Sequence, residues 1–120
     1  MMSVEEQNKA VLTRWYDEMW QKRKFKELMP ELAGPEYTRH EPDGTRVVTN
    51  DQYAEELTKL SERFPPYEAK YDLIADQDKV AVVGTMKMEK NLMHWVQIFR
   101  LEKGKLVETW FPGWVRDVEW

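Results

Sequence analysis

Two polar side chains, His40 and Gln97, have the chemistry that a proton-transfer site requires. A histidine near its ordinary pKa of about 6.5 can accept or donate a proton at neutral pH, and a glutamine amide can donate a hydrogen bond to a substrate carbonyl oxygen. Each residue also has a purely structural interpretation. A lone loop histidine is more often exposed than catalytic, and Gln97 fits equally well as a hydrogen-bonded residue in a cavity wall.

The segment around Gln97 is typical of a β-hairpin, because two apolar-rich runs within 97–110 are joined by a charged turn that contains Gly104. Side chains alternate between the two faces of a strand, so the residues on the face of Gln97 follow from their spacing. They are Trp95, Phe99, Thr109 and Phe111. A cavity with this aromatic wall suits a planar or polycyclic apolar ligand.

The opposite face of this hairpin is also apolar. Its outward positions hold Val96, Ile98, Leu106 and Trp110. So large a patch is unusual in a monomer, and we expect a symmetric homodimer that packs sheet against sheet. On the same face Arg100 and Glu108 are expected to form a salt bridge, although a bulge that turned Glu108 inward would make it a general base. His94 shares this parity, which places it on the outer face or in a subunit interface.

The chain has no recognisable metal or cofactor motif. The two histidines lie far apart in the sequence, and a His40–Asp43 pair is the only combination that could contribute ligands. Asp43 is more simply the first residue of an Asp-Gly turn. The five glycines are isolated at turns and caps and form no phosphate-binding loop, so we expect neither metal nor cofactor.

Composition argues against several classes of protein. A chain of 120 residues with 42% hydrophobic and 33% charged residues is typical of a globular protein, and we expect one domain over residues 1–120. A net charge of −4 without a basic run argues against nucleic-acid binding, and no apolar stretch is long enough to cross a bilayer. The absence of cysteine and of an apolar leader favours a cytoplasmic location.

Capping residues and apolar spacing predict three helices. Ser3 and Glu6 form a capping box that opens a helix over about 4–22. A second helix, from Phe25 to Ala33, ends at the Gly34-Pro35 pair. The third begins near Thr49-Asn50-Asp51 and ends at Pro65-Pro66.

After these prolines the apolar period changes from helical to two. An extended segment is expected at 37–41, before an Asp43-Gly44 turn, and further strands at 67–75 and 79–89 precede the hairpin. Four consecutive antiparallel strands after three helices give an α+β fold. We expect the helices to lie across one face of a strongly curved sheet, with no further helix within 67–110.

This order of elements resembles the cone-shaped fold of nuclear-transport-factor-2-like proteins, and in particular the SnoaL-like polyketide cyclase family. The similar segments run from Asn8 to Trp20, from Tyr37 to Pro42, and from Phe99 to Trp110, which includes the turn at Gly104 and Lys105. The resemblance covers nearly the whole chain. It implies a cone with a central pocket, on which enzymes and catalytically silent ligand binders both occur.

The resemblance also implies roles for particular residues. The family's His-x-Pro element matches His40 and Pro42, which implies that His40 faces the pocket at the mouth of the cone and acts as the acid/base. The histidine or glutamine before the family's Phe-Arg matches Gln97, which would hold the substrate oxygen. Tyr37 and Trp15 are expected to join the substrate-binding wall.

The sequence departs from the family at one catalytic position. The common His-Trp-Asp falls on Thr109-Trp110-Phe111, so Phe111 replaces the aspartate that would serve as acid/base. We expect a small cofactor-independent enzyme that acts by acid/base catalysis on an apolar carbonyl compound, as a cyclase or isomerase does. The alternative is a non-catalytic binding module for a hydrophobic or aromatic small molecule. In either case the tail, 114–120, closes the cone or docks on another subunit.

Overall fold

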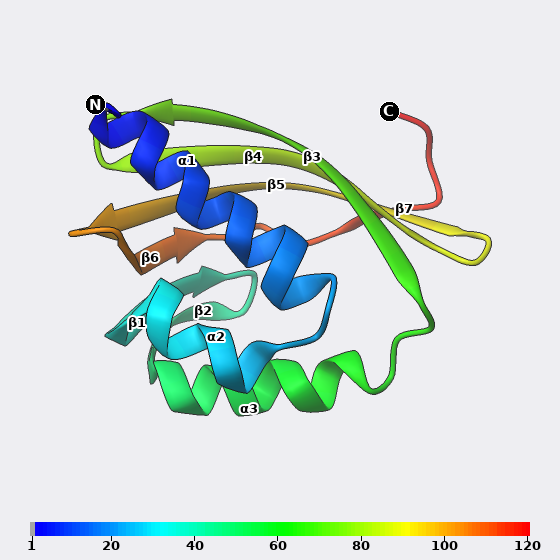
Figure 1. The fold of residues 1–120 in the computed structure, drawn as a ribbon. Coiled ribbons are helices and arrows are strands. Elements are labelled where there is room, and N and C mark those ends of the chain that lie inside the picture. The colour runs from blue at the N-terminus through cyan, green and yellow to red at the C-terminus, as the bar shows by residue number, and fades with distance from the viewer. Residues whose placement is uncertain (1) are drawn as a thin grey trace.

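The computed structural model describes residues 2–120, in which three α-helices pack on one face of a strongly curved seven-stranded sheet (Figure 1). The sheet bends around the helices, so the core lies between its inner face and the helical layer. This is the α+β fold predicted from the sequence. As expected, residues 67–110 contain strands and turns and no helix.

The helices begin where the sequence offers capping residues. The helical elements are α1 (Val4–Arg14), the π-helical turn η1 (Trp15–Trp20), α2 (Phe25–Leu32) and α3 (Asn50–Ser61). At the start of α1 the Ser3 hydroxyl accepts a hydrogen bond from the Glu6 N–H at 3.1 Å. At the start of α3, Thr49 and Gln52 form a reciprocal capping box.

The strands form one sheet, and the helices pack against its inner face. They are β1 (Ala33–Glu41), β2 (Gly44–Thr49), β3 (Tyr67–Asp76), β4 (Lys79–Met88), β5 (Asn91–Glu102), β6 (Lys105–Trp110) and β7 (Val115–Arg116). Their order is β2-β1-β6-β5-β4-β3, and β7 pairs with the first half of β5. The β1–β6 pair is parallel, whereas the other pairs are antiparallel.

Several element boundaries differ from the predictions. The first helix is regular only to Arg14, and the third ends at Ser61, before the two prolines. Strand β1 starts at Ala33, earlier than expected, because Ala33 pairs with Leu106 in β6. Strand β2 was not predicted, since five of its six side chains are exposed and its sequence lacks an apolar alternation.

A bulge in β6 corrects the predicted position of Leu106. Arg100 pairs with Glu108 but the next residue, Leu101, pairs with Leu106, so Val107 is an extra residue in β6. The bulge shifts the alternation, and Leu106 is fully buried in the core instead of lying on the outer face. Glu108 keeps its outward position and forms the predicted salt bridge with Arg100, with Nε and Oε1 2.8 Å apart.

Candidate functional site

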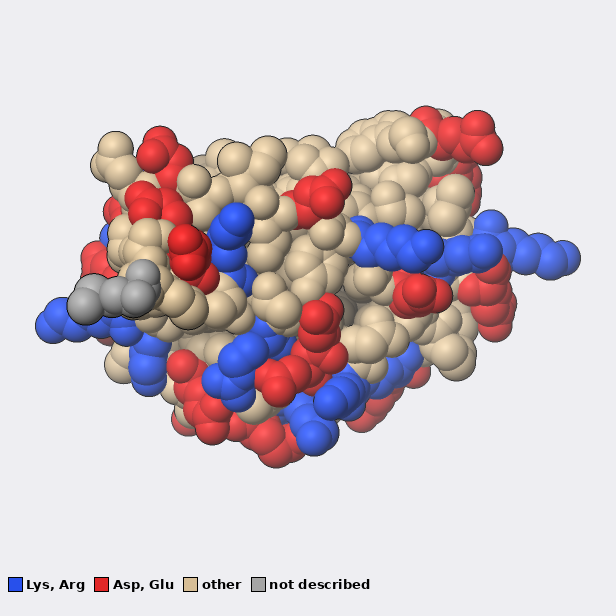
Figure 2. Space-filling view, turned by 45° about the horizontal axis from the view of Figure 1, so that its top comes forward, with Lys and Arg blue, Asp and Glu red and all other residues tan. Residues whose placement is uncertain are grey.

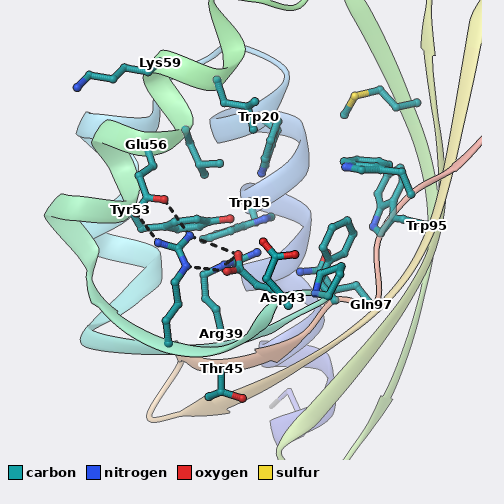
Figure 3. Close-up of a pocket in the computed structure, with 18 of the residues that line it drawn as sticks. Trp15, Trp20, Arg39, Asp43, Thr45, Tyr53, Glu56, Lys59, Trp95 and Gln97 are labelled. Atoms are coloured by element: carbon teal, nitrogen blue, oxygen red, sulfur yellow. Dashed lines mark hydrogen bonds and ion pairs between the residues drawn. The ribbon is translucent and has the colours of Figure 1, made fainter.

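A pocket of about 820 Å³ lies between the helices and the inner face of the sheet (Figure 3). This volume falls in the range of about 300–1,000 Å³ that is typical of small-molecule sites. Its aromatic wall consists of Trp15, Tyr16, Trp20, Trp95, Phe111 and Trp114. Its charged mouth includes Arg39, Glu41, Asp43, Arg46 and Glu56.

Four residues of the aromatic wall form a continuous set of ring contacts. The Trp95 ring lies 5.7 Å from Tyr16 and 5.4 Å from Trp114, measured between centroids, and Trp114 lies 5.4 Å from Phe111. These spacings are typical of tilted and edge-to-face aromatic pairs. The rings of the wall therefore support one another in an apolar surface.

The π-helical turn η1 brings the helical part of this wall together. Trp15, Tyr16, Met19 and Trp20 are all buried in this one turn. The wider turn of a π-helix changes which side chains share a face, and such turns often occur at functional sites. Here it turns two tryptophans and the intervening Tyr16 toward the same cavity.

Tyr16 has a hydroxyl group without a partner. Its oxygen is buried and makes no hydrogen bond within residues 2–120, although buried hydroxyls are nearly always bonded. Burial also raises the pKa of the Tyr16 phenol above its ordinary value of 10. Tyr16 is therefore a neutral phenol in the pocket lining whose hydroxyl has no hydrogen-bond partner among the described residues.

Gln97 lies on the strand side of the same pocket. Its Nε2 donates to the Thr109 hydroxyl at 2.9 Å, and that hydroxyl donates to the Ile98 carbonyl oxygen at 2.9 Å. These bonds fix the orientation of the amide. The second N–H of Gln97 and its carbonyl oxygen have no protein partner in the described part of the chain, so a ligand can use them.

Arginines engage two carboxylates at the charged mouth. Glu41 accepts hydrogen bonds from Arg39 at 2.9 Å and from Arg46 at 2.6 Å, and Arg46 also binds both oxygens of Glu56 at 2.8 and 3.0 Å. Burial disfavours the charged form of Glu41, but the hydrogen bonds from Arg46 and Arg39 outweigh it and lower the pKa of Glu41. This network joins β1, β2 and α3 across the mouth.

Asp43 is the remaining carboxylate of the mouth. Its side chain forms no ion pair within residues 2–120, in contrast to Glu41 and Glu56. Asp43 lies in the tight connection between β1 and β2, and Figure 3 shows it turned toward the space between Tyr53 and Gln97. An unpaired carboxylate at this position can accept a proton from a bound molecule.

The structure corrects the expected position of His40. Along β1, Arg39 and Glu41 point into the pocket, so His40 lies between them on the outer face. Its Nε2 donates to Glu108 at 2.7 Å, its Nδ1 lies 2.8 Å from the Thr45 hydroxyl, and its ring stacks on Trp110. His40 joins three strands there and is not part of the pocket lining.

The other expected site residues fall into two groups. Trp15, Trp95, Gln97 and Phe111 line the pocket. Tyr37, Phe99 and Thr109 are fully buried behind that lining. Tyr37 and Phe99 support Trp15, with centroids 6.3 and 5.8 Å from its ring, and Thr109 orients Gln97.

Sequence reasoning missed Tyr16, Trp20 and Arg39 as lining residues. The signal for the first two is the paired spacing of Trp15-Tyr16 and Met19-Trp20, since positions i, i+1, i+4 and i+5 lie together on one broad face of a helix. The signal for Arg39 is its even spacing from the buried Tyr37 along β1.

Two properties of the described residues bear on possible partners. No helix within residues 2–120 is long and apolar enough to cross a membrane. On the face drawn in Figure 2, basic and acidic side chains are interleaved, and the basic residues there do not form the continuous stripe that phosphate backbones require. The same residues contain no cluster of three or more potential metal ligands from His, Cys, Asp and Glu.

Comparisons with known proteins agree with this fold. A model of the SnoaL-like domain matches residues 12–109. Among solved structures, a candidate polyketide cyclase from Acidithiobacillus ferrooxidans has a TM-score of 0.79 at 21% identity, over 97% of this chain and 92% of that one. A candidate ketosteroid isomerase from Kribbella flavida has a TM-score of 0.74 at 16% identity, over 99% and 85% of the two chains.

A third similar structure is IdmH, a candidate polyketide cyclase from Streptomyces antibioticus, with a TM-score of 0.74 at 17% identity over 92% of each chain. At these identities the solved structures establish a shared fold. No curated protein matches the chain significantly in sequence.

Proposed function

The chain belongs to the SnoaL-like domain family, as its motifs indicated, and we propose that it binds an apolar carbonyl compound and transfers a proton on it with its own side chains. The reaction class that fits is isomerisation or intramolecular cyclisation. Two of the similar structures are described as a polyketide cyclase and a ketosteroid isomerase, whose reactions belong to this class and support its choice.

The observation that carries this proposal is the unpartnered Tyr16 hydroxyl in the aromatic wall. When a proton leaves the carbon next to a carbonyl group, negative charge develops on the carbonyl oxygen. A neutral donor in a water-poor wall stabilises that charge strongly, and loss of one such donor typically costs about 10²–10³-fold in rate. Gln97 is the second donor within the same cavity.

Asp43 is the base in this mechanism. Glu41 and Glu56 are held by arginines, which keeps their oxygens occupied and their charge stabilised. Asp43 accepts the proton from the substrate carbon, while Tyr16 donates a hydrogen bond to the enolate oxygen. In an unsaturated ketone, return of the proton from Asp43 to a different carbon of the conjugated enolate completes an isomerisation. In a diketone, the enolate carbon attacks the second carbonyl group, and the alkoxide that forms takes the proton back from Asp43, which completes a cyclisation.

The test is proton exchange in a simple planar ketone. With 2-tetralone in D₂O, the wild-type protein should accelerate replacement of the α-protons by deuterium, followed by NMR. Tyr16→Phe and Asp43→Asn should each reduce this acceleration by about 10²-fold or more. Asp72→Asn, at an exposed position outside the pocket, is the matched control and should leave the acceleration within about twofold of the wild-type value.

The alternative, a binding module, is favoured by one observation: two of the three carboxylates at the charged mouth are engaged by arginines. The same experiment separates the two functions. If the neutral dye N-phenyl-1-naphthylamine binds in the pocket but no ketone exchanges its protons faster than in buffer, the acid/base roles of Tyr16 and Asp43 are wrong. The chain then acts by binding alone.

We also propose a homodimer formed through the outer face of the sheet. Ile74, Ala81, Ile98 and Trp110 occupy paired positions on four neighbouring strands, and Val83 and Val96 form a second row beside them. Ile74, Val83, Val96 and Ile98 each expose at least 39% of their surface. A continuous apolar row of this kind is what a symmetric sheet-to-sheet contact requires.

A further inference from the structure

We propose that Phe111–Trp114 forms a flap over the pocket, and that contacts on the opposite side of the sheet, between the C-terminal tail and His94, hold this flap closed. The inference rests on the proposed binding function only in that the flap controls entry of a ligand. It assigns a function to the tail, which the proton-transfer mechanism does not use.

The flap is the short segment between β6 and β7, two strands that pair with different parts of β5. The last pair between β5 and β6 is Ile98 with Trp110, and the chain rejoins β5 in β7, where Val115 pairs with His94. Figure 1 shows β6 followed by this connection and then by β7 and the C-terminus. The four residues between the two pairings leave the sheet.

The flap lies against the pocket. Phe111 and Trp114 both belong to the lining, and Trp114 packs edge-on against Trp95 at a centroid distance of 5.4 Å. Gly113 has a φ of +117°, a backbone conformation that residues with a side chain rarely adopt. Gly113 thus supplies the sharp turn that returns Trp114 to the pocket.

The backbone holds the flap only lightly at its downstream end. Upstream, the Phe111 N–H donates to the His40 carbonyl oxygen at 2.9 Å, which continues the sheet. Downstream, β7 has only two residues, and the Asp117 N–H donates to the Leu92 carbonyl oxygen at 2.9 Å. Short edge strands with few hydrogen bonds open readily.

Contacts among His94, Val118 and Trp120 on the outer face reinforce this weak end. We call these three residues the C-terminal clasp. The His94 Nε2 donates to the Val118 carbonyl oxygen at 2.6 Å, and the Trp120 ring stacks on the imidazole at 4.7 Å with an interplanar angle of 16°. The Thr85 hydroxyl binds the other ring nitrogen at 2.7 Å. The clasp leaves His94 only 3% exposed.

The clasp and the flap are attached to adjacent residues of β5. His94 points outward into the clasp, and Trp95 points inward against Trp114. The chain therefore places one tryptophan on each side of the same strand. Opening the clasp releases β7, and release of β7 frees Trp114 from the pocket wall.

The first test measures dye binding by stopped flow with N-phenyl-1-naphthylamine. Trp120→Ala should raise both the association and the dissociation rate constants by about three- to tenfold, the range expected when one aromatic pair is lost, and should change Kd less than either rate. Trp120→Phe retains a stacking ring and should restore rates near those of the wild type. Trp114→Ala removes part of the wall and should mainly raise the dissociation rate constant.

Val47→Ala is the matched control, because Val47 is exposed on β2, outside the proposed dimer contact, and makes no contact in the clasp. The proposal is overturned if Trp120→Ala leaves both rate constants within twofold of the wild type, or changes them as Val47→Ala does. Absence of dye binding to the wild type would instead contradict the proposed binding function.

A second test needs no ligand. In hydrogen–deuterium exchange, Trp120→Ala should speed exchange of amides in 111–117 several-fold while those of the β3–β4 pair keep wild-type rates. Equal exchange of 111–117 in both proteins would contradict the clasp even if no dye binds.

Discussion

Tyr16 and His40 have the opposite of the roles that their residue types suggest. Histidine titrates near neutral pH, yet His40 is held on the outer face by Glu108 and Thr45. Tyrosine is an ordinary core residue, yet Tyr16 carries the unpartnered donor of the pocket. Position in the fold, more than intrinsic chemistry, decides which of the two lines the pocket.

Single-residue roles were predictable where strand alternation is regular. The spacing within β5 correctly placed Trp95 and Gln97 on the inner face. The position of His40 was taken from the family resemblance, although alternation from the buried Tyr37 points it outward. Tyr16 was missed because only Trp15 and Met19 of this apolar group were taken as inward positions, although the helical period places Tyr16 beside them.

Glu108 makes the stability of the fold depend on pH. Hydrogen bonds with His40 and Arg100 lower the pKa of Glu108 below its ordinary value of 4.5. A carboxyl group whose pKa falls on folding stabilises the protein above its unfolded pKa and loses this contribution as the pH drops through the folded pKa. Glu108→Gln should therefore lower the free energy of unfolding at pH 7 more than at pH 3.

Urea unfolding at the two pH values measures this difference, with the exposed Glu68→Gln as a control. An equal loss of stability at pH 7 and pH 3 would show that the Glu108 carboxylate contributes nothing through its charge.

At the scale of elements, the β4–β5 pair depends on a glycine. Gly84 pairs with Trp95, and a Cβ at residue 84 would lie 2.4 Å from the Trp95 ring. Since Trp95 is packed between Tyr16 and Trp114, its ring has little room to move. Gly84→Ala should destabilise the fold by about 1–3 kcal/mol, as overpacking in a core does, and should weaken binding of the neutral dye.

The double substitution Gly84→Ala with Trp95→Phe provides the check, because a smaller ring relieves the clash. Chemical denaturation should show that the two changes together cost less than the sum of their separate effects. Simple additivity would mean that residue 84 and the ring do not interact.

Elements with strong local signals were predicted well. The caps at Ser3 and Thr49 set the starts of α1 and α3, and period-two spacing identified β3, β4 and β5. Strand β2 was missed because its exposed residues lack an apolar alternation. The β6 bulge was missed because one extra residue in a strand leaves no signal in the spacing of that strand alone.

At the scale of the whole molecule, the apolar rows on the outer face of the sheet predict that the protein is a dimer. Val96→Lys places a charge in the middle of the apolar rows and should convert a dimer into a monomer at micromolar concentrations in sedimentation velocity. Val47→Lys is the same change on β2, near the other edge of the sheet, and should leave the dimer intact. A wild-type protein that sediments as a monomer would contradict the proposed interface.

The distribution of tryptophans has an optical consequence. Four of the six, Trp15, Trp20, Trp95 and Trp114, line the pocket, whereas Trp110 and Trp120 stack on histidines at the outer face. A bound polycyclic ligand that absorbs in the near ultraviolet would accept excitation energy from the inner four over distances of a few ångströms. The chain's own emission would then report occupancy of the pocket, so that an unlabelled sample could be screened directly for the compound it binds.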